Sequence, residues 1–163
     1  MKTADVEVRL ARLSDADVIA TMSRDYIEHG LPWTWTRARV AASIADPETN
    51  VVVVGERGAL CAFGIMSYPN DDAHLLLFAV RESSRRRGVG SAILRWLEEA
   101  ARTAGAKRIR VECRKDNDAA RNFYCEHGYA ELTVTARFYR GLKDGIHLVK
   151  WFSTPGEDSP LIR

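Results

Sequence analysis

Hydrophobic and polar residues alternate in several short stretches of the chain, a pattern typical of strands with one solvent-facing side. In 5–13, hydrophobic residues alternate with charged ones, and the same alternation returns in 107–114. Residues 74–81 instead form an almost continuous apolar run, which predicts a strand buried on both faces. Further strands are predicted at 51–54, 61–68, 129–139 and 146–152.

Helix signals lie between these strands. The pair Ser14 and Asp17 is typical of a capping box and predicts a helix to about residue 28. Thr36 is expected to cap a helix over 37–45, which Asp46-Pro47 stops. Further along, a helix begins at residue 89 and closes before Gly105, and another follows Asp116 or Asn117 and ends before Gly128; Arg57-Gly58 predicts a hairpin turn.

The predicted order is therefore β-α-α-β-β-β-α-β-α-β-β. Helices inserted into a mostly antiparallel run of strands indicate one mixed central sheet with helices on both faces, an α/β (α+β) architecture. A length of 163 residues suits about one domain, which we assign to 1–152. Residues 153–163 contain two prolines and a glycine and are expected to form a flexible tail.

Composition narrows the class of protein. The charged fraction of 28% and the hydrophobic fraction of 46% are ordinary for a soluble globular protein, and a net charge of +2 makes no general case for nucleic-acid binding. Cys61, Cys113 and Cys125 lack metal spacing, as do the four histidines, so we expect free thiols and no metal. Without an apolar leader or a membrane-length run, the expected location is the cytoplasm, with no membrane partner.

The stretch Arg85-Arg86-Arg87-Gly88-Val89-Gly90 joins the apolar strand to the helix that follows. Glycine permits positive φ and close approach of a ligand, and the first amides of a helix carry its positive dipole end. The pattern therefore predicts an anion site of the kind that binds pyrophosphate, with arginines to pair with phosphate. It lacks the Gly-Lys-Ser/Thr of a P-loop and the spacing of a dinucleotide fingerprint. An arginine-rich solvated turn is the alternative.

A second constellation follows at fixed spacing. Glu112 lies on a predicted strand, Asn117 five residues further on and Tyr124 seven beyond that, before Gly128-Tyr129. With the 85–90 turn upstream, this order resembles the GNAT superfamily of N-acetyltransferases along essentially the whole chain. The RimI-type branch, the ribosomal-protein alanine acetyltransferases, is the most similar.

The resemblance implies an acyltransferase that moves an acetyl group from acetyl-CoA to a primary amine by direct attack in a ternary complex. It implies that Glu112 accepts the amine's proton, that Tyr124 protonates the departing thiolate, and that a bulged strand over 78–80 offers an N–H to the acetyl carbonyl. Coenzyme contacts are implied at Phe78, Ala79, Val80, Arg85, Arg86, Arg87, Gly88, Val89, Gly90, Ser91 and Asn117.

Each assignment has an alternative in the residues themselves. Glu112 is also compatible with a solvated strand charge, and Arg110 and Arg114 on its face would lower its pKa and weaken it as a base. Glu28 and Glu82 are substitutes for the base. Tyr124 is also compatible with a core residue and Asn117 with a helix cap.

The acceptor is the least determined part. Trp33, Trp35 and Tyr139 are candidate substrate-binding residues, although the tryptophans are equally compatible with core packing. Both a peptide N-terminus and a small-molecule amine fit, in a monomer or a homodimer. A coenzyme A-binding regulatory module without turnover is the main rival from another class. Nucleic-acid binding through Arg85–Arg87 and 108–114 is a weaker one, which steep salt dependence would reveal.

Overall fold

The computed structural model describes residues 6–139 and 143–152, with the backbone alone for 133–139 and 143. The strands are β1 (Val8–Leu10), β2 (Thr49–Glu56), β3 (Ala59–Ser67), β4 (Asp72–Val80), β5 (Arg108–Arg114), β6 (Ala130–Tyr139) and β7 (Lys143–Trp151). The helices are α1 (Ala16–Met22), α2 (Arg37–Ala45), α3 (Val89–Thr103) and α4 (Asp118–Glu126), with short helical segments η1 (Leu13–Asp15), η2 (Ser23–Ile27) and η3 (Glu82–Ser84). The predicted order is confirmed. The predicted tail 153–163 lies outside the described residues.

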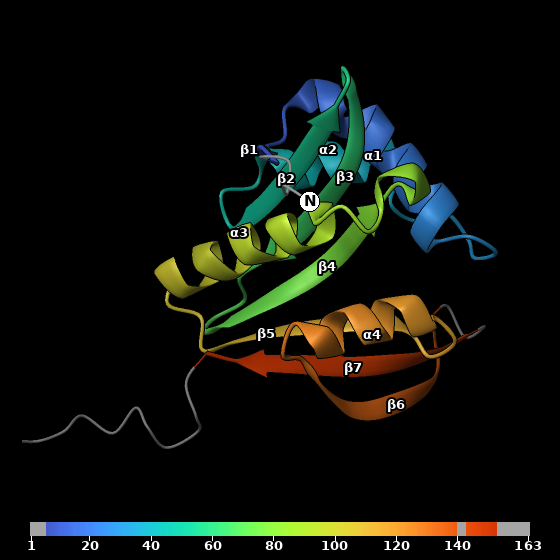
Figure 1. The fold of residues 1–163 in the computed structure, drawn as a ribbon, viewed down its shortest axis with the longest axis vertical. Coiled ribbons are helices and arrows are strands. Elements are labelled where there is room, and N and C mark those ends of the chain that lie inside the picture. Colours follow the sequence, from blue (N-terminus) through green and yellow to red (C-terminus); the bar gives the residue numbers. More distant parts are fainter. Residues whose placement is uncertain (1–5, 140–142, 153–163) are drawn as a thin grey trace, which may run out of the picture.

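The seven strands form one mixed sheet in the order β1-β2-β3-β4-β5-β7-β6 (Figure 1). Among the described strands, β4 and β5 pair in parallel and every other neighbouring pair is antiparallel. The parallel pairing runs only from Asp72↔Arg108 to Leu75↔Val111. Beyond that point the two strands no longer pair with each other, and Figure 1 shows them diverging toward their carboxyl ends. The sheet is therefore two antiparallel halves that part on one side of a short parallel seam.

Helices cover both faces of the sheet, as predicted. One core cluster packs α1 and α2 against β2, β3 and β4, with Ile19, Val40 and Phe63 fully buried. The other packs α3 and α4 against the opposite face, with Ile93 and Leu97 fully buried. Among the described helices, none has the length and apolar character needed to cross a membrane.

Several local signals act as predicted. The Thr36 hydroxyl accepts a hydrogen bond from the Arg39 N–H at 3.4 Å and caps α2, whose bounds are those predicted. Asn117 rather than Asp116 caps α4, since its Oδ1 accepts from the Ala120 N–H at 3.1 Å. In the β2–β3 hairpin, Gly58 has φ +79°, a conformation that favours glycine.

The predicted helix over 14–28 needs a correction. It is three helical segments in sequence, η1, α1 and the π-helical η2. The Ser14/Asp17 capping box is wrong, because the carboxylate that accepts the Arg12 N–H, at 2.8 Å, belongs to Asp15. Asp15 is also paired at 2.8 Å with Arg9. The ion pair with Arg9 on β1 holds Asp15 in place, so Asp15 is the carboxylate that accepts the backbone N–H at the start of the helix.

A second correction concerns the bulge in β4. Leu77 pairs with Ile65 and Leu75 with Met66, so the register shift leaves Leu76 as the extra residue. The predicted bulge over 78–80 is thus displaced toward the start of the strand. The segment from Phe78 to Val80 pairs regularly with β3.

Candidate active site

The parting of β4 and β5 opens a cleft of about 1270 Å³. Its walls come from η2 and the loop after it, from β4, from the turn before α3, and from β5 and α4. Many predicted site residues line it: Trp35, Phe78, Ala79, Val80, Arg85, Arg86, Gly88, Gly90, Ser91, Glu112, Asn117 and Tyr124. Residues distant in sequence are thus gathered around one cavity.

The open edge of β4 presents backbone groups to this cleft. The Arg81 N–H donates to the Cys61 carbonyl on β3 at 2.7 Å. Because polar groups alternate in direction along an antiparallel strand, Ala79 also faces β3, while the N–H groups of Phe78 and Val80 face the cleft. The Val80 carbonyl accepts from Arg85 Nε at 3.0 Å, which agrees with that direction. β5 does not pair here, so these amides are available to a ligand.

The turn before α3 has the backbone geometry of an anion seat. Gly88, the N-cap, has φ +80°, and Arg86 has φ +63° although it is not glycine. The Ala92 N–H donates to the Gly88 carbonyl at 3.0 Å, so the amides before Ala92 precede the helical ladder. These amides and the positive end of the helix dipole favour a bound anion.

The three arginines of this turn have different settings. The side chains of Arg85 and Arg86 line the cleft. Arg87 points elsewhere, since its Nη1 lies 2.6 Å from Oε1 of Glu56 on β2. Ser84 Oγ donates to the other oxygen of Glu56 at 2.8 Å. Arg87 therefore ties the turn to the sheet, and Val89 beyond it is a buried core residue.

A close contact between α3 and α4 completes this end of the cleft. A side chain at Gly90 would come within 3.3 Å of the Phe123 ring and 3.4 Å of the Phe78 ring. Ser91 Oγ lies 2.8 Å from His127 Nε2, and His127 Nδ1 lies 2.7 Å from the Phe123 carbonyl. A carbonyl only accepts, so in the neutral imidazole Nδ1 donates and Nε2 accepts from Ser91. Sequence reasoning missed His127, whose partner is 36 residues away.

Glu112 is held between two histidines. Its Oε2 lies 2.5 Å from His74 Nε2, and its Oε1 lies 3.4 Å from His147 Nδ1. Burial raises the pKa of Glu112, but the hydrogen bond and charge of His74, with the charges of His147 and Arg110, lower that pKa by more. The pKa therefore lies below its ordinary value, the direction predicted from the arginines, with His74 as the larger cause.

Sequence reasoning missed both histidines because they lack ligand spacing along the chain. Register brings them together. His147 on β7 lies directly opposite Glu112, and His74 on β4 lies opposite Arg110, two residues before Glu112. Only the strand pairing carries this information.

The position of Tyr124 is compatible with both predicted roles, that of a core residue and that of the proton donor to the thiolate. It is buried in the cluster under α3 and α4 and also lines the cleft. Its ring centroid lies 5.5 Å from those of Phe123 and Tyr129 and 6.2 Å from that of Phe78. The aromatic contacts fix the ring at the cleft wall.

The buried carboxylate of Glu28 organises the opposite wall. It accepts the N–H groups of Thr34 at 2.8 Å and Trp35 at 3.2 Å, the Thr34 hydroxyl, and the Ser23 hydroxyl at 3.4 Å. Glu28 thus fastens the loop between η2 and α2. Of the two substitute bases, Glu28 has its carboxylate occupied by these donors, and Glu82 is exposed in η3.

Arg114 fastens the same wall to β5. Its Nη2 donates to the carbonyls of Ile27 and His29, both at 2.6 Å. The end of η2 is therefore tied to the strand that carries Glu112.

The two tryptophans differ. Trp35 is 8% exposed, belongs to the core under α1 and α2, and also lines the cleft, so it packs in the core and is at the cleft wall at the same time. Trp33 is 44% exposed beside Arg24 and lies outside the cleft wall, a departure from the expected pair. Tyr139 pairs through its backbone with Lys143, and its side chain lies outside what the structure describes.

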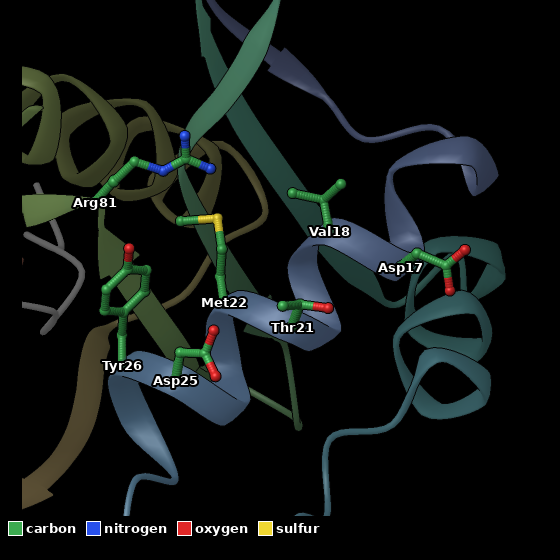
Figure 2. A pocket seen from close by; sticks show the side chains of 7 residues that line it. All are labelled: Asp17, Val18, Thr21, Met22, Asp25, Tyr26 and Arg81. Carbon is green, nitrogen blue, oxygen red and sulfur yellow. The ribbon is translucent and has the colours of Figure 1, made fainter. Parts of the chain in front are cut away.

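A smaller hollow of about 270 Å³ lies beside α1 and η2 (Figure 2). Tyr26 and Met22 point toward Arg81 there. Its two carboxylates already have partners, Asp17 with Arg37 and Asp25 with Arg24, each at 3.0 Å. Within 6–139 and 143–152, no three His, Cys, Asp or Glu side chains are grouped to hold a metal.

The sequence pattern of the acetyltransferase (GNAT) family matches residues 18–129. The chain therefore belongs to this family, a class of acyl-CoA-dependent N-acetyltransferases.

Two relatives illustrate the similarity. The chain is 32% identical over 100 residues to an uncharacterized N-acetyltransferase, MJ1530, of Methanocaldococcus jannaschii, a match that spans 61% of this chain and 62% of that protein. It is 27% identical over 137 residues to the ribosomal protein bS18-alanine N-acetyltransferase of Salmonella typhimurium, spanning 82% of this chain and 90% of that protein. The predicted resemblance to the RimI type is confirmed, at modest identity.

Solved structures share the fold. Ard1 from Thermoplasma volcanium superposes with a TM-score of 0.80 at 23% identity, covering 93% of this chain and all of that one. The PaiA N-acetyltransferase from Thermoplasma acidophilum, solved with coenzyme A, gives 0.76 at 14% identity, covering 91% of this chain and all of that one. The predicted GNAT fold is confirmed.

Proposed function

We propose that this protein transfers an acetyl group from acetyl-CoA to the α-amine of a peptide or protein N-terminus, by direct attack in a ternary complex. One observation carries the proposal: the cleft is lined from both faces of the sheet. Tyr124 belongs to the face under α3 and α4. Glu112 lies between Val111 and Cys113, which share that cluster, so Glu112 points to the opposite face.

The coenzyme fits the side of the cleft that is built from backbone. The diphosphate would bind the amides of 86–91, with Arg85 and Arg86 beside it. Asn117, at the cleft wall, would contact the pantetheine arm while its Oδ1 caps α4. The thioester would then reach the open edge of β4.

The steps of acetyl transfer can be assigned to the other groups that line the cleft. The amine nitrogen forms a bond to the thioester carbon, and the carbon–sulfur bond breaks as the tetrahedral intermediate collapses. An N–H of Phe78 or Val80 would stabilise the oxyanion, since both face the cleft. Glu112 would accept the amine's proton directly or through water, and Tyr124 would protonate the thiolate. An acceptor that arrives as an ammonium loses two protons in each turnover: one leaves to solvent before attack, and the other passes to Glu112 and replaces the proton that Tyr124 gives to the thiolate.

The lowered pKa of Glu112 favours an α-amine over a lysine as acceptor. An α-amine has a pKa near 8 and a lysine near 10.4, so at pH 7 about one α-amine in ten is neutral against about one lysine in 2500. A weak base is sufficient for an α-amine, because a larger fraction of it is already neutral. The relative from Salmonella typhimurium, an alanine N-acetyltransferase by name, supports the same class.

The test is a thiol-release assay with acetyl-CoA and matched acceptors. We expect release with an alanine-initiated hexapeptide, none with the same peptide blocked at its N-terminus, and one added acetyl group by mass spectrometry. Glu112→Gln should lower kcat/KM by about 10²-fold, a typical contribution of a general base. Release with polyamines, amino acids or aminoglycosides alone would instead indicate a small-molecule acceptor. Coenzyme binding without release to any amine would indicate a regulatory module.

A further inference from the structure

The two carboxylate oxygens of Glu112 are held unequally. Oε2 lies 2.5 Å from His74 Nε2, a direct and very short hydrogen-bond contact. Oε1 lies 3.4 Å from His147 Nδ1, beyond the usual N–H···O range. An ionised carboxylate only accepts, so His74 Nε2 donates. One oxygen is tied to β4, and the partner of the other within the described part of the chain is His147, at the longer distance.

We infer that His74 is a positioning residue for the acceptor: it holds Glu112 by Oε2 and leaves Oε1 as the oxygen that receives the acceptor's N–H. The inference rests on the proposed function, in which Glu112 meets the amine. Glu112 lines the cleft, whereas His74 is outside the lining and acts through Glu112.

The surrounding charges leave Glu112 as the partner of His74. On β4 and β5, Asp72 is paired with Arg108 at 2.8 Å and with Arg110 at 3.3 Å. From β7, the titratable group is His147, already beside Oε1.

η2, which packs against β4, contributes further titratable groups. Arg24 and Asp25 pair with each other at 3.0 Å, and Tyr26 lines the cleft. Glu28, just beyond η2, accepts the donors of the neighbouring loop. No charged residue occurs in β3 from Ala59 to Ser67.

His74 also sets the charge state of Glu112. Burial by itself raises the pKa of Glu112, and the hydrogen bond from His74 is the largest influence that lowers it. Without His74 the pKa of Glu112 would rise, and more of Glu112 would be protonated, and unable to accept a proton, at acidic pH. The loss of kcat/KM in a His74 variant would be larger at low pH and smaller at high pH. Purely structural damage would lower kcat/KM at every pH.

The experiment compares His74→Leu, which removes the donor, with His74→Gln, whose amide can still donate to Oε2. Carboxyl ¹³C NMR on glutamate-labelled protein, with Glu112→Gln for assignment, measures the Glu112 midpoint without an acceptor. We expect His74→Leu to raise that midpoint by about one pH unit or more. With the alanine-initiated hexapeptide, the acid limb of the kcat/KM profile should move to higher pH by the same amount, so that kcat/KM falls by up to about tenfold below the wild-type midpoint and is unchanged above pH 8. His74→Gln should keep the Glu112 midpoint and the kcat/KM profile close to those of the wild type. His147→Gln should shift the midpoint and the profile less than His74→Leu does.

Acetyl-CoA affinity should stay unchanged in all three variants, as calorimetry will show. An unmoved Glu112 midpoint in His74→Leu, or a moved midpoint with an unchanged pH profile, would overturn the inference. If His74→Leu does not fold, His74→Asn replaces it, because its shorter amide does not reach Oε2. A wild-type protein that acetylates no amine would refute the proposed function, while the NMR midpoint would still decide whether His74 holds Glu112.

Discussion

The two sides of the cleft are built in different ways. The proposed coenzyme side, here the segment 78–91 with Asn117, offers mainly backbone amides from one continuous stretch of chain. The proposed acceptor side, here the loop 28–35 with Glu112 and its histidines, is built from side chains of that loop, β4, β5 and β7. One side is local in sequence and the other is assembled across the sheet.

The difference teaches where each side is vulnerable. Backbone amides remain when a side chain is replaced, so the coenzyme side should fail mainly when its φ angles change or a charge enters the seat. Each side-chain contact of the acceptor side disappears with one substitution. Changes on one side should therefore leave the other side's affinity intact.

The largest expected effect comes from Gly88→Asp. The substitution puts a side chain on a residue with φ +80° and a carboxylate beside the diphosphate. Loss of two charge-assisted hydrogen bonds, at about 1.5–3 kcal/mol each, predicts a rise in the acetyl-CoA Kd on the order of 10³-fold by calorimetry. Gly58→Asp is the control, since Gly58 has φ +79° in a hairpin turn with open space around it. Retained affinity in Gly88→Asp would refute the anion seat.

Tyr124→Phe should have the next largest effect, on kcat. Loss of the proton donor to the thiolate predicts a fall of about 10²-fold, with the acetyl-CoA Kd unchanged because the ring contacts persist. Steady-state kinetics and calorimetry together measure both. Tyr129→Phe serves as control: its hydroxyl donates to Glu98 at 3.1 Å, so this change should lower Tm and spare kcat. Full activity in Tyr124→Phe would remove Tyr124 as the acid.

Glu28→Gln should affect the acceptor side alone. The amide keeps one acceptor oxygen in place of two, which loosens the loop that Thr34 and Trp35 anchor. We expect the KM for the hexapeptide to rise about tenfold and the free energy of unfolding to fall by about 1–3 kcal/mol. The exposed Glu82→Gln is the comparison. If Glu28→Gln abolished kcat at an unchanged KM, Glu28 would be the base instead of Glu112.

The smallest expected effect is the loss of folding stability when the pH is lowered. A hydrogen bond from Arg9 lowers the pKa of Asp15, and one from Arg108 lowers the pKa of Asp72. A carboxylate with a lowered folded-state pKa stabilises the fold above its unfolded value, near 3.8 for Asp, and that stability is lost as pH falls through the folded value. The free energy of unfolding, measured with urea, should therefore be constant from pH 7 to pH 5 and should decrease below about pH 4. Asp72→Asn should flatten that slope, and an unchanged slope would contradict the pairing with Arg108.

Much of the fold follows from local chemistry. The caps Thr36 and Asn117 and the turn at Gly58 lie where the sequence predicts them, because each depends on a few neighbouring residues. The helix start at Asp15 was mispredicted because its partner Arg9 sits on another element. The bulge at Leu76 follows from pairing with β3, which no local pattern displays.

The sequence by itself determined the element order, the glycine turn before α3 and the spacing that identifies the family. These depend on alternation, glycine conformations and helix ends, which neighbouring residues encode. Tertiary structure alone decided which side chains meet at Glu112, that Trp33 is not among the residues lining the cleft, and that Arg87 pairs with Glu56 on β2. The reason is register: His74 and Glu112 are 38 residues apart, and only the pairing of β4 with β5 brings them into contact.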